Sequence, residues 1–217
     1  MIKRRYTHYQ KYLTSEEWRK ITEWLETKLK SPSSRIVFYI MAFGLRVGEA
    51  VRLKRLDFNA DFTKLYYTPL KKRGNPTIHE RFIPPSLQER LQAYDKKHKR
   101  RYRNGFMFFP FANQSKNDHI QRSTISFLFT RLRKDLNFKE VYFVREGTRD
   151  LKMRALYRIT PHTLRHYFSL NFYLKSNHNL VLTSQVLSHA DVRTTARYIN
   201  PLKASKLEQD AINQMVF

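Results

Sequence analysis

The sequence predicts an α+β fold that is mainly helical and carries a small three-stranded antiparallel sheet. Apolar residues recur at helical spacing in several segments, but between residues 55 and 85 the period changes towards two, which is typical of short strands. With 217 residues, 41% of them apolar, the chain can bury a full core as one large domain. We expect this domain over residues 14–200, between a basic segment at 1–13 and a tail helix at 201–217.

The first part of the chain is expected to be helical. Residues 14–30 open with a Thr-x-x-Glu capping box and carry apolar residues at helical spacing, which predicts an amphipathic helix. The sequence SPSS at 31–34 interrupts this pattern. The apolar run at 36–53 then predicts one or two buried helices that are broken near Gly44.

Three segments that follow alternate in the manner of antiparallel strands. They are RLDFN at 55–59, TKLYYTPL at 63–70 and ERFIPP at 80–85. The last turn of this sheet places Lys71, Lys72 and Arg73 beside Gly74. Such a basic tip is suited to entering a DNA groove, although most turns of this composition are simply solvated.

Two more helices and a hairpin are expected in the middle of the chain. Residues 86–103 predict a helix that ends in the basic patch KKHKRRYR, where phosphate contact and plain solvation are comparably common. Residues 123–136 predict an amphipathic helix with Ser123 as a candidate cap, and 141–159 alternate around Gly147 like a hairpin. The DNA-binding candidates are Lys96, Lys97, Arg100 and Arg101 from the patch, with Lys71 and Arg73 from the earlier turn.

The run TPHTLRH at 160–166 is the most informative feature of the chain. Thr160 has the side chain of an N-cap and Pro161 the fixed φ of a first helical residue, so a helix should begin here. His162 and Arg165 lie on one face, where free N–H groups and the positive end of the helix dipole favour a phosphate. On these residues alone, a capped surface helix with a solvated Arg is equally consistent.

Two shorter helices are expected at the end of the domain. Apolar residues of NLVLTSQVLSH at 179–189 lie mostly on one face, and Asp191 is a candidate cap for a helix that carries Tyr198 near its end. His189 follows Arg165 by 24 residues, and Tyr198 follows nine further on. A phenol behind paired His and Arg residues suggests a nucleophile beside a phosphate pocket.

The charge of the chain indicates nucleic acid as a partner. Lys and Arg number 42 against 18 Asp and Glu, for a formal net charge of +24. This imbalance in a folded chain favours nucleic acid first and an anionic membrane second. The membrane interpretation weakens because no apolar stretch approaches the roughly 20 residues of a span. We expect an intracellular, DNA-associated protein of the cytoplasm or nucleoid.

Composition also limits the chemistry. The chain has no cysteine, which excludes disulfides, thiolate catalysis and Cys-ligated zinc. The eight histidines show no HExxH pattern, and the acidic residues form no cluster of the kind expected of a two-metal nuclease. We therefore expect chemistry without a metal or another cofactor.

Four ordered segments resemble the catalytic domain of tyrosine recombinases, the lambda-integrase and Xer-like family. They are GLRVGEAVRL, the basic hairpin turn, PHTLRHYFSL and VLSHADVRTTARYI, and together they span roughly residues 14–205. The resemblance implies the catalytic-domain fold of that family. It also implies a catalytic set of Arg46, Lys72, His162, Arg165, His189 and Tyr198, with Glu49 in support. A purely structural ion pair between Arg46 and Glu49 is the alternative for those two residues.

Three features depart from the family pattern. The hairpin turn is longer than usual, so Lys71 competes with Lys72, which fits better because Arg73 and Gly74 follow it. Family members usually have an N-terminal core-binding domain that clamps the other face of DNA, and no separate one is evident here. Ser188 stands where a glycine commonly precedes the third His.

The resemblance implies that Tyr198 attacks a scissile DNA phosphate, forming a 3′-phosphotyrosyl bond and releasing a 5′-hydroxyl. The forked guanidinium groups of Arg46 and Arg165 would hold the non-bridging oxygens in the transition state. The other implied roles are base or proton relay for His162, general acid for Lys72, a phosphate hydrogen bond for His189 and orientation of the pocket for Glu49.

The implied partner is double-stranded DNA, on which family members assemble as tetramers. The C-terminal segment at 201–217 is then either exchanged between protomers or packed in cis. The nearest alternative function is that of a type IB topoisomerase-like enzyme, which uses the same chemistry to relax DNA. A non-catalytic, recombinase-derived DNA-binding protein comes next, followed by a basic RNA-binding domain.

Overall fold

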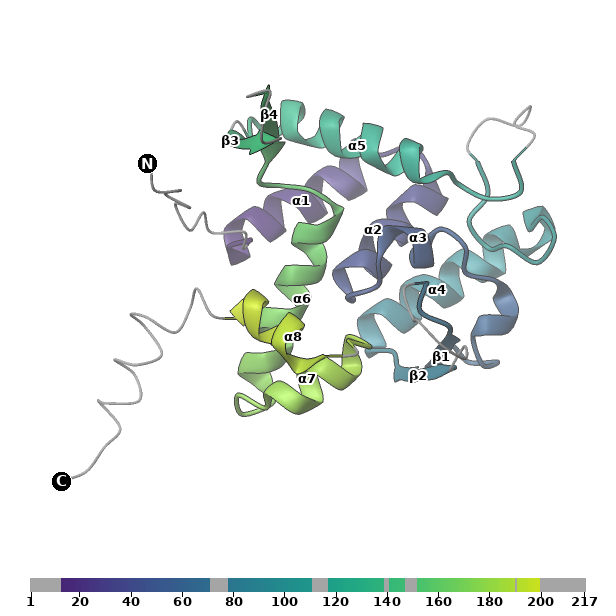
Figure 1. The fold of residues 1–217 in the computed structure, drawn as a ribbon. Coiled ribbons are helices and arrows are strands. Elements are labelled where there is room, and N and C mark those ends of the chain that lie inside the picture. Colours follow the sequence, from purple (N-terminus) through teal and green to yellow (C-terminus); the bar gives the residue numbers. More distant parts are fainter. Residues whose placement is uncertain are drawn as a thin grey trace, which may run out of the picture.

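The computed structural model describes residues 13–70, 78–110, 117–138, 141–146, 152–189 and 191–199, with the backbone alone for 141–146, 152–156 and 197–199. The expected mainly helical α+β fold is confirmed (Figure 1). The elements are α1 (Ser15–Thr27), α2 (Pro32–Ala42), α3 (Val47–Ala50), a 3₁₀ helix (Arg55–Asp57), β1 (Lys64–Tyr67), β2 (His79–Phe82), α4 (Pro85–His98), a second 3₁₀ helix (Lys99–Arg101), α5 (Arg122–Asp135), β3 (Val141–Glu146), β4 (Lys152–Tyr157), α6 (Pro161–Lys175), α7 (Leu180–Val186) and α8 (Val192–Ile199).

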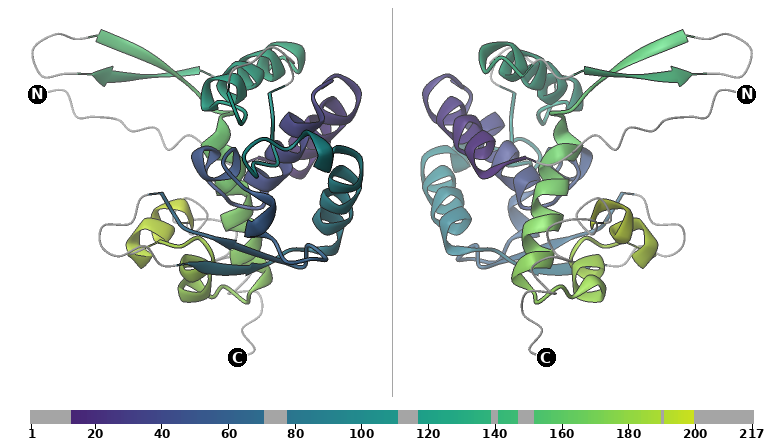
Figure 2. Two further views of the ribbon diagram at one scale, coloured as in Figure 1. Left: turned by 90° about the vertical axis from the view of Figure 1, so that its right-hand side faces the viewer. Right: turned by 90° about the vertical axis from the view of Figure 1, so that its left-hand side faces the viewer.

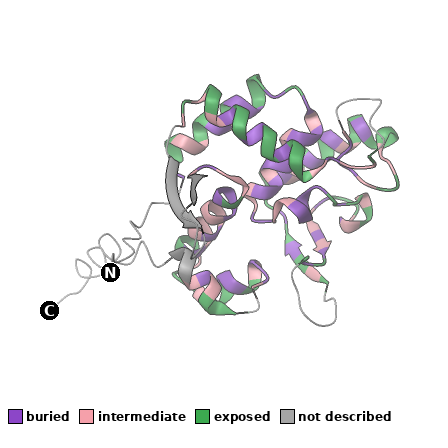
Figure 3. Cartoon of the chain, turned by 45° about the horizontal axis from the view of Figure 1, so that its top comes forward, coloured by how far each residue is buried: buried purple, intermediate pink, exposed green. Residues whose placement is uncertain are grey.

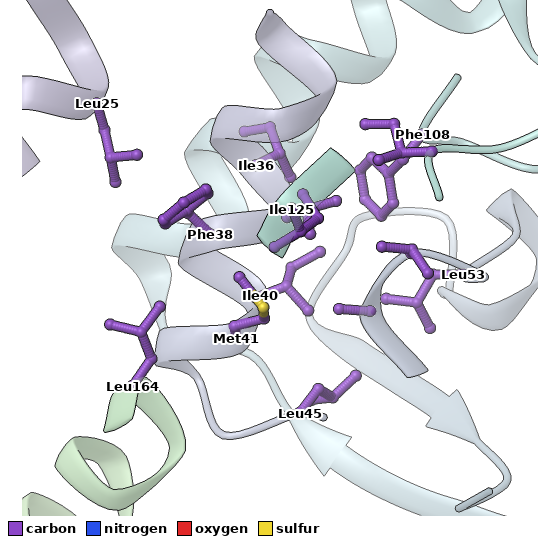
Figure 4. Close-up of a cluster of buried hydrophobic side chains, with 14 of the residues drawn as sticks. Leu25, Ile36, Phe38, Ile40, Met41, Leu45, Leu53, Phe108, Ile125 and Leu164 are labelled. Atoms are coloured by element: carbon purple, nitrogen blue, oxygen red, sulfur yellow. The ribbon is translucent and has the colours of Figure 1, made fainter. Parts of the chain in front are cut away.

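Helix α2 is the centre of the hydrophobic core. It packs against α3, α4 and α6, so apolar residues on several of its sides are buried. Phe38 stacks on Phe129 of α5 with ring centroids 4.7 Å apart. Figure 4 shows Ile40 and Met41 of α2 with Leu164 of α6 in the same cluster. The apolar run at 36–53, predicted to be buried, therefore forms the centre of the core. Figure 3 shows that the surrounding helices each have a buried and an exposed face.

Local capping sets where the first two helices begin. The predicted capping box is present, because the Glu17 amide donates to Thr14 Oγ1 at 3.1 Å and the Thr14 amide donates to Glu17 Oε2 at 2.8 Å. Ser31 caps α2 by accepting from the Ser34 amide at 3.2 Å, and Pro32 is its first residue. The SPSS sequence is thus the start of α2, and the break between the two helices lies at 28–31, earlier than predicted, because α1 ends at Thr27.

The predicted break near Gly44 separates α2 from α3. Gly44 has φ of +97°, and a Cβ there would lie 2.5 Å from Cδ1 of Phe168. Only glycine fits both the conformation and the close approach of α6. This turn brings Arg46 to the position immediately before α3.

The predicted three-stranded sheet has two strands. β1 and β2 pair antiparallel, with Lys64 opposite Phe82 and Tyr67 opposite His79. The segment predicted as the first strand, 55–59, instead contains the 3₁₀ helix, and only Phe58 makes an isolated bridge to β1.

Local hydrogen bonds explain why 55–59 is not a strand. The Lys54 amide donates to Asp57 Oδ2 at 2.7 Å, and Arg55 Nη1 donates to the carbonyls of Phe58 and Asn59 at 3.2 and 3.1 Å. These bonds occupy backbone groups that a strand would offer to its neighbour.

Two other details differ from the sequence prediction. The predicted cap Ser123 lies inside α5, which begins at Arg122 after Gln121, and Gln121 makes no side-chain cap bond. The helix predicted over 86–103 ends at His98 and continues only as the second 3₁₀ helix.

The hairpin predicted over 141–159 is confirmed, since β3 and β4 pair antiparallel and project from the helical body (Figure 2).

The last three helices pack together beside the β1–β2 sheet. α7 and α8 both contact α6, as Figure 1 shows. Asn179 caps α7 by accepting from the Leu182 amide at 2.8 Å, and Asp191 accepts from the Arg193 amide at 2.8 Å at the start of α8, as predicted. Within the ranges that the structure describes, no helix is both long and apolar enough to cross a membrane. Segments 1–12 and 201–217 lie outside those ranges.

Candidate active site

The ion pair between Arg46 and Glu49, the structural alternative for these two residues, is formed. Nη1 of Arg46 donates to Oε1 of Glu49 at 2.9 Å, and the Arg46 amide donates to Oε2 at 2.8 Å. The Glu49 side chain is 2% exposed and that of Arg46 is 21% exposed. One buried carboxylate therefore fixes both the backbone and the guanidinium of an arginine that is still open to a ligand.

Arg165 projects from α6 into the interior and is 2% exposed. Its Nη1 donates to the Gly44 carbonyl and its Nη2 donates to the Leu187 carbonyl at 2.5 Å. These carbonyls follow the C-terminal ends of α2 and α7, where helix dipoles are negative. Burial, and then the charge of Arg46, lower the pKa of Arg165 to about 10, so it is still charged at pH 7. Its buried Nε has no hydrogen-bond partner among the described residues.

His189 joins α6 to α8. Its Nε2 lies 3.1 Å from Nη2 of Arg165, and its Nδ1 lies 2.7 Å from Oγ1 of Thr195. Arginine can only donate, so Nε2 accepts from Arg165, and Nδ1 carries the proton that is donated to Thr195. Burial, and then the charge of Arg165, lower the pKa of His189 to about 3. The ring is therefore neutral at pH 7.

These four side chains form one electrostatic unit, which we call the arginine cluster: Arg46, Glu49, Arg165 and His189. The charge of Arg46 lowers the pKa of both Arg165 and His189, and Glu49 raises that of Arg165. With two guanidinium groups, one carboxylate and a neutral imidazole, the arginine cluster carries a net positive charge. It is suited to binding an anionic oxygen group such as a phosphodiester. No set of three or more His, Cys, Asp or Glu within the described ranges is placed to hold a metal ion.

The two other catalytic candidates on helices have the expected positions in the chain. His162 lies in the first turn of α6, three residues before Arg165, and its side chain is exposed. Tyr198 lies in α8, three residues after Thr195. The position of the Tyr198 phenol relative to the arginine cluster stays a prediction.

The basic turn leaves β1 next to the arginine cluster. Lys71, Lys72 and Arg73 lie outside the described residues. The amide of Leu70, the residue before Lys71, donates to Oε1 of Glu49 at 3.4 Å. The turn therefore starts beside the carboxylate that holds Arg46.

The second basic patch is separate from the arginine cluster. Lys96 and Lys97 lie in the last turn of α4, Arg100 and Arg101 lie in the 3₁₀ helix that follows, and all four are exposed. The Arg101 guanidinium lies over the ring of Phe109, 4.4 Å from its centroid. Because α4 starts next to β2, its length places this patch about 20 Å from the sheet.

Sequence reasoning missed one buried arginine. Arg81 of β2 is 5% exposed, and its Nε donates to the Val186 carbonyl at 2.9 Å and its Nη1 to the Phe43 carbonyl at 3.0 Å. It thus ties the sheet to the ends of α2 and α7, next to the carbonyls that Arg165 binds. The period-two alternation with the buried Ile83 could have placed Arg81 on the inner face of its strand.

A family model described as the phage integrase family matches residues 11–205, and the chain therefore belongs to this family. A curated relative, the tyrosine recombinase XerD of Oceanobacillus iheyensis, is 28% identical over 188 residues, which cover 83% of this chain and 54% of the relative. The chain spans about half the length of the curated relatives it matches.

Solved structures share the fold. The XerA recombinase superposes with a TM-score of 0.70 at 19% identity, covering 95% of this chain and 66% of its own. The XerH site-specific recombinase, in a post-cleavage complex with its difH substrate, gives a TM-score of 0.65 at 20% identity, covering 92% and 52%. The mainly helical fold predicted from the resemblance is thus that of tyrosine recombinase catalytic domains.

Proposed function

We propose that the chain acts in site-specific DNA recombination, cleaving and rejoining DNA through a 3′-phosphotyrosyl intermediate on Tyr198. The observation that carries this proposal is the arginine cluster, which unites residues from distant segments beside the helix that contains Tyr198. Membership of the phage integrase family and relatives named tyrosine recombinases support it. The family match gives no support to the topoisomerase-like alternative.

Catalysis in this proposal rests on arginines that are held before DNA arrives. The transition state gains negative charge on the two non-bridging oxygens of the scissile phosphate. Glu49 fixes Arg46, and two carbonyls fix Arg165, so neither guanidinium must reorganise as that charge develops. Preorganised donors of this kind typically contribute a factor of about 10² to 10³ each.

Proton transfers complete the reaction. A phenol has a pKa near 10, so His162, exposed at the start of α6, would take the proton from Tyr198 directly or through water. Lys72 would give a proton to the departing 5′ oxygen. His189 would give up the bond that its Nε2 accepts from Arg165 and donate to the phosphate as its Nε2–H tautomer, with the Thr195 hydroxyl then donating to Nδ1.

A covalent-trapping experiment tests the proposal. A duplex is first selected from a random-sequence pool by binding to the full chain, then incubated with the protein in EDTA and quenched with SDS. We expect a covalent protein–DNA band for the wild type and for Tyr157→Phe, an exposed tyrosine at the end of β4. The band should be absent for Tyr198→Phe. Attachment by Tyr198→Phe, or no attachment by the wild type to the selected duplex, would overturn the proposal.

The proposed partner is double-stranded DNA inside the cell, and the proposed assembly is a tetramer on that DNA. The Tn1549 transposon integrase, which shares the fold, is solved in complex with transposon right end DNA, and this supports the choice of partner. The basic patch at Lys96, Lys97, Arg100 and Arg101 would contact phosphates away from the reacting one. Light scattering of the complex with the selected duplex measures the assembly, and a protein that stays monomeric on DNA would contradict the tetramer.

A further inference from the structure

The buried hydroxyl of Ser188 is hydrogen-bonded to the residues at both ends of the basic turn's strands, Tyr67 and His79. Tyr67 is the last residue of β1 and His79 the first of β2, and the two face each other across the pair. Oγ of Ser188 lies 3.0 Å from the Tyr67 hydroxyl and 3.1 Å from Nδ1 of His79. Ser188 is the residue immediately before His189. The base of the turn at 68–78 is therefore bonded to the backbone segment that carries a member of the arginine cluster.

The backbone of Ser188 is in a conformation that disfavours a side chain. Its φ is +53°, in the left-handed region where a Cβ is crowded by the following carbonyl. Glycine adopts this conformation freely, and a glycine is what the resemblance leads one to expect here. A strained residue persists where its surroundings fix it strongly. In this chain the serine gains two buried partners that glycine could not have.

The sheet carries further bonds to the same region. Arg81 lies two residues after His79, on the same face of β2, and its Nε donates to the Val186 carbonyl at 2.9 Å. At the other side of the turn, the Leu70 amide donates to Glu49 at 3.4 Å. The inner face of the sheet is thus fastened to the segment before His189, and the residue before the basic turn is bonded to the Arg46–Glu49 pair.

We propose that the Tyr67–Ser188–His79 hydrogen bonds, here called the hydroxyl lock, position the lysine of the turn for proton donation to the 5′ oxygen. This inference rests on the proposed function. Tyr67 and Ser188 are positioning residues, since both are buried and act through Lys72. Fixing both ends of a loop restricts the conformations open to the residues between them, so the hydroxyl lock favours the arrangement in which Lys72 donates its proton.

The first test needs no DNA. Tyr67→Phe removes one bond of the hydroxyl lock and keeps the aromatic ring. Amide hydrogen exchange of β1 and β2 should become about 10-fold faster in this variant, because the sheet opens locally more often. Tyr66→Phe is the matched control, because Tyr66 is its neighbour on the opposite face of the strand, opposite Glu80. Unchanged exchange in Tyr67→Phe would overturn the lock.

The second test isolates the proton transfer. In the ordinary reaction the Tyr198 oxygen forms a bond to phosphorus, the bond from phosphorus to the 5′ oxygen breaks, and Lys72 protonates that oxygen. A duplex with sulfur in place of the bridging 5′ oxygen releases a thiolate, which leaves without a proton because thiols are far more acidic than alcohols. This duplex has the sequence selected above, with the sulfur at the mapped cleavage position.

Single-turnover cleavage of the two duplexes tests whether Tyr67 acts through proton donation by Lys72. Tyr67→Phe should cleave the ordinary duplex about 10- to 100-fold more slowly than wild type and the sulfur duplex at nearly the wild-type rate. A merely structural defect would slow both reactions alike, and equal losses would overturn the proposal. Full activity on the ordinary duplex would also overturn it.

Ser188→Gly gives an independent variant that should fold. Glycine accepts φ of +53° without strain but removes both bonds of the hydroxyl lock. We therefore expect Ser188→Gly to cleave the ordinary duplex more slowly than wild type and the sulfur duplex at nearly the wild-type rate. Unchanged cleavage of the ordinary duplex by Ser188→Gly would count against the lock. If the wild type forms no covalent band, the proposed function fails, while hydrogen exchange still decides whether the lock exists.

Discussion

At the scale of single residues, Arg165 and Arg81, both buried, show how this chain keeps charges inside its core. Arg165 and Arg81 both donate to carbonyls that follow or end α2 and α7. The last carbonyls of a helix have no intrahelical donor and carry the negative end of the dipole, so each guanidinium satisfies groups that would otherwise be unpaired. Burial lowers the pKa of both arginines. The acceptors are the carbonyls of Phe43, Gly44, Val186 and Leu187.

Arg46→Lys tests whether the fork of Arg46 matters beyond its charge. Lysine keeps the charge but loses the planar pair of donors, so we expect single-turnover cleavage of the selected duplex to fall about 100-fold. Affinity for that duplex should change much less. Arg52→Lys, at an exposed arginine just after α3, is the control and should cleave normally. Unaltered cleavage by Arg46→Lys would show that Arg46 is only structural.

The neutral state of His189 predicts a loss of stability in acid. Its folded pKa is about 3, whereas an unfolded histidine has a pKa near 6.5, so between these values the unfolded chain binds a proton that the folded chain does not. The free energy of unfolding should therefore fall as the pH drops from about 6.5 towards 3. Allowing for solvent screening of the partly exposed ring, His189 should account for about 1 kcal/mol of the difference between pH 7 and pH 5.

Urea unfolding at the two pH values measures this contribution. His189→Gln cannot gain a proton, so the difference between pH 7 and pH 5 should shrink in this variant. His178→Gln, at an exposed histidine between α6 and α7, should retain the wild-type difference. The same pH dependence in both variants would contradict a buried neutral His189.

At the scale of elements, the break between α2 and α3 builds one side of the arginine cluster. The turn at Gly44 presents its carbonyl to Arg165 and places Arg46 directly before α3. Helix α6 can approach because Gly44 has no side chain, and Phe168 fills the space where a Cβ would be. Packing and site geometry therefore depend on the same turn.

Gly44→Ala should destabilise the fold by about 2 to 4 kcal/mol, because it combines backbone strain with overpacking against Phe168. Gly105→Ala is the matched control. Gly105 also has a positive φ, +78°, but a Cβ there would approach only Cδ of Lys54, at 3.8 Å. It should lose only the strain, about 1 kcal/mol. Equal losses in urea unfolding would show that contact with Phe168 is unimportant.

At the scale of the whole molecule, the net charge of +24 predicts a strong salt dependence for binding to DNA, the proposed partner. If about 6 to 10 phosphates are neutralised, the logarithm of the association constant should fall with the logarithm of salt concentration, with a slope near −0.9 per contact. Binding to the selected duplex at several salt concentrations measures this slope. A flat salt dependence would contradict DNA as the partner.

The same measurement tests the patch at the end of α4. Lys96→Gln combined with Lys97→Gln should reduce the slope by about 2, since each contact contributes about 0.9. Arg19→Gln combined with Lys20→Gln removes the same charge from α1, where both residues are already paired with Glu23 and Glu16. That control should leave the slope unchanged. Equal effects of the two double variants would show that the patch makes no specific contact.

Features that depend on contacts between residues close together in the chain could be predicted from the sequence. The capping box at Thr14, the break at Gly44, the start of α6 at Pro161 and the Arg46–Glu49 pair all depend on groups within a few residues of one another. Their geometry is set by local backbone conformation and spacing, so residue types in order are enough to indicate them. The ordered motifs likewise indicated the family that the comparison then showed.

The tertiary structure alone decided the features that depend on distant segments. Segment 55–59 has the alternation of a strand, but the Arg55 amide donates to the distant Gly105 carbonyl at 3.0 Å and residues 55–57 form a 3₁₀ helix. The bonds from Arg165 to Gly44 and His189, the burial of Arg81 and the hydroxyl lock at Ser188 each join elements far apart in sequence. Such contacts arise from how helices and strands pack, a long-range property that local periodicity and propensity do not record.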